Sequence, residues 1–132
     1  MLNMDFSQKV VIDSAQQNWG VSRHKGVWPS PLAREEAECG HATSLVKYDA
    51  GASFAAHDHP KGEKTGVLEG VLSDATGDYP VGSYCRNPEG FYHAPFSQQG
   101  CYPAGSWIRS PEMSRHTPYV EQETLILVKV GH

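Results

Sequence analysis

Hydrophobic positions along this chain come in short runs, and Gly, Pro, Asp or Asn residues separate one run from the next. Alternating runs of this length between turn residues are typical of the strands of an all-β barrel or sandwich. Residues 1–8 lack such a run and are expected to form a loose tail. We therefore expect a single all-β domain over residues 1–132, and its clearest strands are predicted at 9–13, 43–48, 65–73 and 124–130.

Segment 32–38 has the composition of a short helix, because Ala and Glu dominate it. The arrangement around it favours strands instead. Segments 32–38 and 43–48 flank Gly40 and His41, and this spacing predicts a hairpin with its turn at these two residues. A polar loop is expected before the hairpin, over 18–29.

Composition limits the kind of protein this can be. At 132 residues, 39% of them hydrophobic, the chain can bury one core. Its formal net charge is −4 and its 11 Lys and Arg residues are scattered, which argues against a nucleic-acid-binding surface. No apolar run approaches the roughly 18 residues of a membrane span, and the first residues lack a signal-peptide pattern. The cysteines, Cys39, Cys85 and Cys101, form no Cys-x-x-Cys pair, which fits free thiols in a reducing compartment. We therefore expect a cytoplasmic protein with neither a membrane nor a nucleic acid as its partner.

The strongest chemical signal is a histidine pair, His57 and His59. On a strand, residues two apart point to the same face, so both imidazoles can reach one ion. The turn-forming residues 60–62 would fold the chain back into a second strand that starts at Glu63 and places a carboxylate beside the imidazoles. Imidazole and carboxylate together suit zinc, iron, manganese, nickel or copper, and do not choose among them.

A His-x-His pair on its own occurs more often as exposed surface than as a metal site. Here the turn, the spaced Glu63 and two bounding glycines, Gly51 and Gly70, accompany the pair. The combination favours a metal site over exposed surface histidines.

A second pattern runs from Gly82 through Pro88 and Gly90 to His93. It predicts a strand that ends at a proline, a glycine-containing turn and a new strand that opens at the histidine. If that strand lies beside the histidine pair, His93 completes a site of three His and one Glu, which leaves one or two positions free on a five- or six-coordinate metal. The neighbours that would either line this site or belong to ordinary barrel packing are Tyr84, Arg86, Phe91 and Tyr92.

Residues 78–100 recur at 101–123 with ten identical positions in 23, which indicates a tandem internal repeat. The repeat offers a second histidine, His116, at the position equivalent to His93. We favour His93, because Gly90 adopts the positive φ of a turn easily and the second copy has a methionine at that position. The alternative, in which His116 binds and the first copy is an inserted hairpin, stays open.

The two patterns resemble the two defining motifs of the cupins, the first over 51–70 and the second over 82–93. Ser97 stands where the second motif usually has Asn, which is not a metal ligand. Within the cupins, the chain resembles the ChrR-type group over most of its length. The resemblance implies a small jelly-roll β-barrel, or double-stranded β-helix, of antiparallel strands with a metal inside. It carries the ligand roles onto His57, His59, Glu63 and His93.

The resemblance also implies a function. Cupins with three His and one Glu hold one divalent metal ion, such as zinc, iron, manganese, nickel or copper, and often act as dioxygenases or isomerases on oxygenated small molecules. Glu63 could then act as a base. One alternative is a zinc-binding sensor that reports an oxidative or ligand state to a protein partner, and another is a purely structural metal. The residues do not decide whether the chain is an enzyme. Barrels of this kind commonly pair through edge strands, so we expect a homodimer.

Overall fold

The computed structural model describes residues 1–35, 41–59, 61–101 and 106–109. Within these residues the chain forms short strands, one turn of 3-10 helix and no α-helix, which confirms the all-β prediction. The elements in chain order are β1 (Val10–Asp13), η1 (Ser14–Gln16), β2 (Val27–Arg34), β3 (Ala42–Tyr48), β4 (Ala52–Ser53), β5 (His57–His59), β6 (Glu63–Gly66), β7 (Val71–Asp74), β8 (Gly77–Pro80), β9 (Tyr84–Asn87), β10 (Phe91–His93), β11 (Phe96–Ser97) and β12 (Ser106–Arg109).

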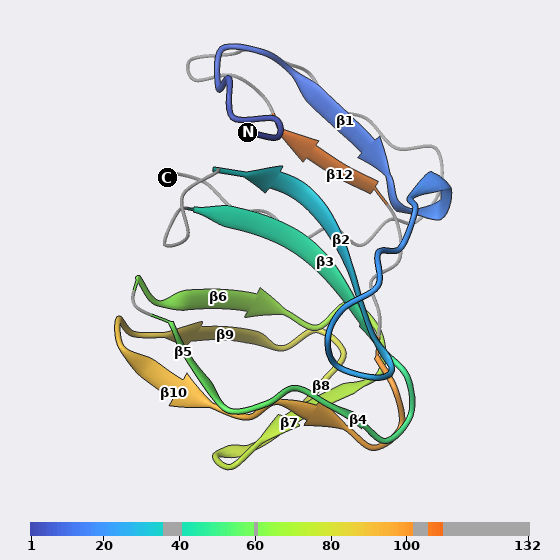
Figure 1. Ribbon diagram of the computed structural model, residues 1–132, viewed down its shortest axis with the longest axis vertical. Coiled ribbons are helices and arrows are strands. Elements are labelled where there is room, and N and C mark those ends of the chain that lie inside the picture. Colours follow the sequence, from blue (N-terminus) through green and yellow to red (C-terminus); the bar gives the residue numbers. More distant parts are fainter. Residues whose placement is uncertain (36–40, 60, 102–105, 110–132) are drawn as a thin grey trace.

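The pairings between these strands are antiparallel. β1 pairs with β12, β2 with β3, β5 with β10 and β6 with β9, while β4, β11, β7 and β8 form a four-stranded sheet in that order. In Figure 1, β1, β12, β2 and β3 lie in the upper half of the molecule and the other strands in the lower half. The two sheets that carry the candidate ligands, β5–β10 and β6–β9, therefore belong to the same half.

The predicted hairpin is formed by β2 and β3, which pair along their length with a register irregularity after Pro31. The polar loop expected before it is shorter than predicted, because β2 already begins at Val27 rather than after Pro29. Pairing with β3 and the burial of Leu32, which is 1% exposed, override the helix propensity at residues 32–34, the part of the segment 32–38 that belongs to β2. The turn predicted at Gly40 lies outside the described residues.

The run 65–73, expected to be one strand, is divided between β6 and β7, so that prediction is wrong. β6 pairs with β9, whereas β7 pairs with β8 and β11. Between the two strands the backbone N–H of Val67 donates to Ser83 at 3.0 Å and its carbonyl accepts from Gly82 at 2.8 Å. Gly70 then turns the chain into β7 with a φ of 78°. The chain changes pairing partner here, and a hydrophobic pattern does not carry that information.

The start of the chain, predicted to be a loose tail, is attached to β2. Leu2 and Arg34 form an antiparallel bridge with two backbone hydrogen bonds of 2.8 Å. The side-chain amide of Asn3 donates to the carbonyl of Leu32 at 2.7 Å.

The strand predicted at 9–13 is confirmed by β1, which pairs with β12 from the second copy of the repeat. Of that copy, 101–123, the structure describes only Cys101 and 106–109. The repeat therefore stays a prediction, and the strand predicted at 124–130 lies outside the described residues.

The hydrophobic core is small, and two buried serines extend it. Ser30 and Ser97 are 0% exposed and each donates a hydrogen bond, to the side-chain carbonyl of Gln17 at 2.6 Å and to the backbone carbonyl of Val71 at 2.5 Å respectively. Ser97 thus ties β11 to β7 at the position where the second cupin motif usually has Asn. The core cluster consists of Val27, Tyr48, Ala52 and Cys101, with Val46, Phe54 and Leu72 packed against it.

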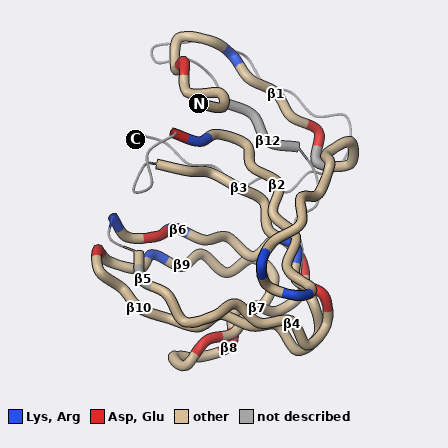
Figure 2. The backbone as a smooth tube through the Cα atoms, viewed as in Figure 1, with Lys and Arg blue, Asp and Glu red and all other residues tan. Residues whose placement is uncertain are grey.

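Basic residues are interspersed with acidic ones along the described backbone (Figure 2). They occur near β1 and singly on β2, β3, β6 and β9, while the loop before β2 carries two, Arg23 and Lys25. Within the part of the chain that the structure describes, no helix has the length and apolar character that a membrane span requires.

Candidate metal centre

Pairing of β5 with β10 brings the two histidine patterns together. In the antiparallel register, His93 lies opposite His57 and Phe91 lies opposite His59. The turn before β10 sets this register: the N–H of Gly90, which has a φ of 74°, donates to the carbonyl of His59 at 2.8 Å. The glycine that the sequence pattern singled out thus holds the start of β10 against the end of β5.

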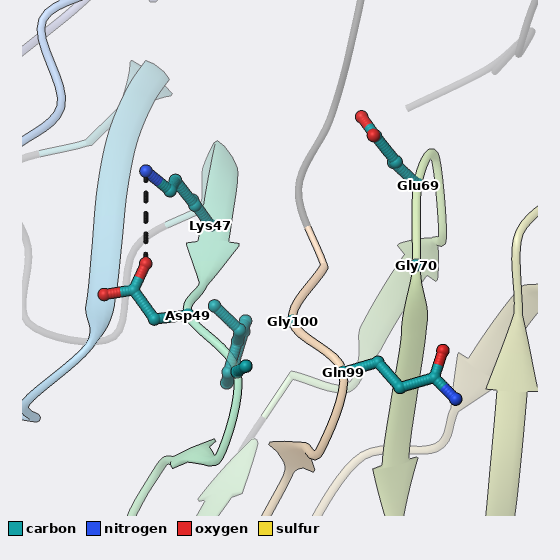
Figure 3. Close-up of a pocket in the computed structure, with 8 residues that line it drawn as sticks. Lys47, Asp49, Glu69, Gly70, Gln99 and Gly100 are labelled. Atoms are coloured by element: carbon teal, nitrogen blue, oxygen red, sulfur yellow. Dashed lines mark ion pairs between the residues drawn. The ribbon is translucent and has the colours of Figure 1, made fainter.

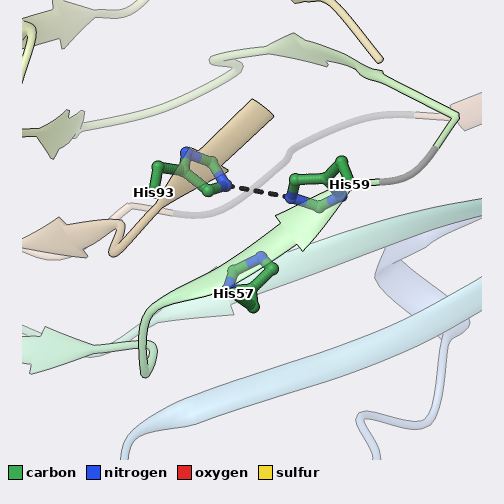
Figure 4. A group of neighbouring side chains, drawn as sticks. All are labelled: His57, His59 and His93. Atoms are coloured by element: carbon green, nitrogen blue, oxygen red, sulfur yellow. Dashed lines mark hydrogen bonds between the residues drawn. The ribbon is translucent and has the colours of Figure 1, made fainter. Parts of the chain in front are cut away.

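The three imidazoles form a compact group (Figure 4). One nitrogen from each of His57, His59 and His93 lies within 4.8 Å of the other two. The Nε2 atoms of His59 and His93 are 3.0 Å apart. The ring centroids are separated by 4.6 to 5.0 Å, with the rings inclined edge to face. The prediction that these three side chains share one face of two paired strands is confirmed.

A backbone carbonyl orients His57. Its Nδ1 lies 2.8 Å from the carbonyl oxygen of Ala55. A carbonyl oxygen can only accept, so Nδ1 carries the proton and Nε2 keeps a free lone pair. This is the tautomer that a metal ligand needs, and such a hydrogen bond from the far ring nitrogen is usual in metal-binding histidines.

Glu63 lies beside the histidine group. Its carboxylate oxygens are 3.6 Å from His59 Nε2 and 3.5 Å from His93 Nε2. Asn87, the residue opposite Glu63 in the β6–β9 pair, donates from Nδ2 to Glu63 Oε2 at 3.2 Å. The sequence placed Glu63 in a hairpin with the histidine pair, and that detail is wrong, because β5 pairs with β10 and β6 pairs with β9.

The group is open to solvent on one side. The side chains of His59 and Glu63 are 23% and 28% exposed, whereas that of His93 is 7% exposed. Aromatic rings flank the other two histidines, with Phe54 at 4.7 Å from His57 and Phe91 at 5.2 Å from His93 between ring centroids. A small molecule would therefore reach the group from the side of His59 and Glu63.

Of the four neighbours singled out in the sequence, only Phe91 has a ring contact with His93. Tyr84, Arg86 and Tyr92 are exposed. On β9 the side chains alternate, so Cys85 and Asn87 are the less exposed residues and the other two face solvent.

Sequence reasoning missed Asp74, the last residue of β7. Its Oδ2 lies 3.5 Å from His93 Nδ1, and this nitrogen has no hydrogen-bond partner within the described residues. Its Oδ1 accepts from the N–H of Thr76 at 2.8 Å, the Thr76 hydroxyl at 2.5 Å and the Tyr79 hydroxyl at 3.3 Å. Burial raises the pKa of Asp74, but the hydrogen bonds from Thr76 and Tyr79 and the nearby imidazole of His93 together hold that pKa below its ordinary value. The only signal for Asp74 in the sequence was its position as an acidic residue at the end of a strand, before a turn.

Three groups near the core are held neutral. Burial raises the pKa of the Tyr48 phenol, and Coulomb repulsion from the Cys101 thiolate, once that thiol ionises, and from Glu63 raises it further. Burial likewise raises the pKa of the free thiols of Cys85 and Cys101. Thiols with raised pKa values are poor nucleophiles, which agrees with a structural role for both cysteines. Cys39 lies outside the described residues.

A separate pocket of about 390 Å³ lies between β3 and the segment before β7 (Figure 3). Lys47 and Asp49 pair at 3.9 Å on its β3 side, and Asp49 also accepts from the indole of Trp28 at 3.0 Å. None of its lining residues belongs to the histidine group. Those residues are Lys47, Tyr48, Asp49, Ala50, Glu69, Gly70, Gln99 and Gly100.

The donor set fits a transition-metal ion. Two imidazole nitrogens that bind one ion at about 2.1 Å and roughly at right angles are about 3.0 Å apart. The Nε2 atoms of His59 and His93, which share a hydrogen bond of 3.0 Å in this structure, are already that close. His116, the alternative to His93, lies outside the described residues. The choice of His93 as the third histidine ligand therefore rests on the position of His93 alone.

Comparison with known proteins agrees with this fold. A family model described as ChrR Cupin-like domain matches residues 7–102. The crystal structure of an RmlC-like cupin from Shewanella frigidimarina NCIMB 400 is similar with a TM-score of 0.55 and 16% sequence identity, and the match covers 76% of this chain and 91% of that chain. At this identity the likeness shows the fold alone. Comparison with curated proteins found no significant match.

Proposed function

Because this chain belongs to the family of ChrR cupin-like domains, we propose that its three clustered histidines and Glu63 hold one divalent transition-metal ion and that it acts as a small metalloenzyme on an oxygenated small molecule. The bound ion would supply a Lewis acid that polarises a substrate oxygen. The reaction class we propose is that of a dioxygenase or an isomerase.

The observation that carries this proposal is the imidazole group itself. One nitrogen from each of three imidazoles converges from two paired strands, and a carboxylate lies within 3.6 Å of two of them. With Glu63 as the fourth ligand, a five- or six-coordinate ion keeps one or two positions for substrate. The partial exposure of His59 and Glu63 supports access from that side.

The chain's own residues would carry out the remaining tasks. Asn87 donates to one oxygen of Glu63 and so fixes where the carboxylate points. Glu63 can accept a proton from a substrate bound beside it, in the manner of a general base. Phe54 and Phe91 pack against the rings of His57 and His93 and so help to hold their orientation.

A second candidate function is favoured by the matched family. The ChrR type that the sequence resembles binds zinc in a regulatory protein, and a zinc site would suit a sensor that signals to a protein partner. Zinc is redox-inert, so dioxygenase chemistry would then be excluded.

Elemental analysis of the protein purified without added metal tests both candidates. About one iron, manganese, nickel or copper ion per chain supports the enzyme, and turnover of small diketones or polyphenols would then be screened. About one zinc per chain supports the sensor and makes a search for a protein partner the next step. Absence of bound metal, together with no binding on titration with any of these ions, contradicts the proposal.

A further inference from the structure

Asp74 and His93 face each other in the interior. Asp74 Oδ2 lies 3.5 Å from His93 Nδ1, and the two side chains are 8% and 7% exposed. The nitrogen has no hydrogen-bond partner within the described residues. A shift of a few tenths of an ångström would bring the two atoms within the usual hydrogen-bond range of about 2.7–3.2 Å.

The turn between β7 and β8 fixes the aspartate from its other side. The hydrogen bonds that Asp74 accepts from Thr76 and Tyr79 end on Oδ1, in the pattern of a side chain that caps its own turn. Oδ2 takes no part in that turn. The carboxylate is therefore anchored with its second oxygen directed at the imidazole.

A turn-capping role alone does not explain where Asp74 lies. Capping the turn requires only Oδ1 and can be done from the surface, whereas burying a carboxylate costs free energy unless the charge is compensated. The contact that compensates Oδ2 is His93 Nδ1. The pair resembles the arrangement on His57, where the carbonyl of Ala55 holds Nδ1 and leaves Nε2 free.

We propose that Asp74 is a positioning residue for the metal centre: it accepts the Nδ1 proton of His93 and so holds Nε2 unprotonated and directed at the ion. This inference rests on the proposed metal site. Its chemical basis is that a carboxylate behind a ligating imidazole fixes the tautomer and raises the basicity of the nitrogen that binds metal.

The test replaces Asp74 by asparagine. In Asp74→Asn, the amide oxygen can still accept the hydrogen bonds of the turn, and the amide nitrogen then faces His93. That nitrogen donates, so it would make Nδ1 an acceptor and move the ring proton to Nε2. Metal affinity, measured by competition with a chelator, should fall by about 10–100-fold, the usual effect of losing such a partner.

Nitrogen-15 NMR of the metal-free proteins provides the second measurement. We expect the Nδ1–H tautomer of His93 in the wild type and the Nε2–H tautomer in Asp74→Asn. Asp78→Asn is the matched control, because Asp78 is an exposed aspartate of the same hairpin that accepts from Ser73 at 2.6 Å. It removes the same charge and should change neither the tautomer nor the affinity.

The outcomes separate this inference from the proposed function. Wild-type affinity and an unchanged tautomer in Asp74→Asn overturn the role of Asp74 and leave the metal site intact. A wild-type protein that binds no metal overturns the proposed function, while the tautomer of its His93 still tests the contact with Asp74. If Asp74→Asn does not fold, an Nε2–H tautomer in the wild type is sufficient to overturn the inference.

Discussion

The Nε2 atoms of His59 and His93 lie 3.0 Å apart, although 34 residues separate these histidines in the chain. Pairing of β5 with β10 creates this contact, so each histidine depends on the other strand for its place. The first prediction follows from it.

Alanine at any of the three clustered histidines should weaken metal binding by more than about 100-fold, because losing a ligand costs more than losing a partner behind one. Isothermal titration with zinc or cobalt would measure the affinity. His41→Ala is the control, because His41 is exposed and lies outside the group. If His116→Ala abolishes binding while His93→Ala retains it, the third ligand is assigned wrongly.

Glu63→Gln should reduce metal affinity by about tenfold or more, because it removes a charge that lies within 3.6 Å of two ligand nitrogens. Lys64→Gln changes a charge on the same strand, but Lys64 is exposed on the opposite face of β6. The same titration should show little change in Lys64→Gln. A gain of affinity in Lys64→Gln as large as the loss in Glu63→Gln would mean that Glu63 acts only through the net charge of the region.

The two glycines at the ends of the first motif, Gly51 and Gly70, should differ sharply in the stability that is lost when each is mutated to alanine. Gly51 and Gly70 have similar φ values, 79° and 78°, but a Cβ on Gly51 meets nothing within 4 Å, whereas a Cβ on Gly70 would lie 2.2 Å from the carbonyl oxygen of Gly100. Gly51→Ala should cost about 1–2 kcal/mol for its backbone conformation. Gly70→Ala should cost about 1–3 kcal/mol more, since backbone must shift.

Urea unfolding of the two glycine variants measures this difference directly. Gly51→Ala serves as the control for the positive φ that both positions share. Equal destabilisation would show that the close approach of β7 to the segment at Gly100 is not rigid.

In Tyr48→Phe, the free energy of unfolding should fall less steeply at alkaline pH than in the wild type. The pKa of the folded phenol is raised above its ordinary value of about 10, so the phenol is neutral in both states below that pH. Above it the unfolded chain ionises first, and the free energy of unfolding falls by up to about 1.4 kcal/mol per pH unit until the folded phenol also ionises. Phenylalanine has no such group.

Chemical denaturation at pH 8, 10 and 11 would provide the comparison for Tyr48→Phe. The variant should differ from the wild type by a constant amount below pH 10 and gain relative stability above it. A difference that does not change with pH would mean that the phenol ionises as easily in the folded protein as in the unfolded chain.

Local spacing predicted most of the candidate site. His57 and His59 are two positions apart on a strand and therefore share a face, and the glycine turn at Gly90 set the register of His93 as its residue type suggested. These are short-range consequences of backbone geometry. The all-β class followed from the same kind of evidence.

Strand partners were harder to predict than strands. β5 and β6 are consecutive, yet each pairs with a strand of the following motif, and the apolar run after Glu63 divides between two sheets. Such choices depend on which edges meet in three dimensions. Asp74 was missed for the same reason, because nothing in its own turn indicates that His93 lies behind it.

The register of β10 on β5 has a consequence for how the chain avoids folding into a wrong pairing. Side chains alternate along a strand, so a slip of one residue would turn His93 outward and bring the exposed Tyr92 into its place. Three-residue strands provide few contacts to reject such a slip. An ion that requires all three imidazoles binds one register only. Metal binding would therefore stabilise the correct pairing of β10 with β5 over the shifted one.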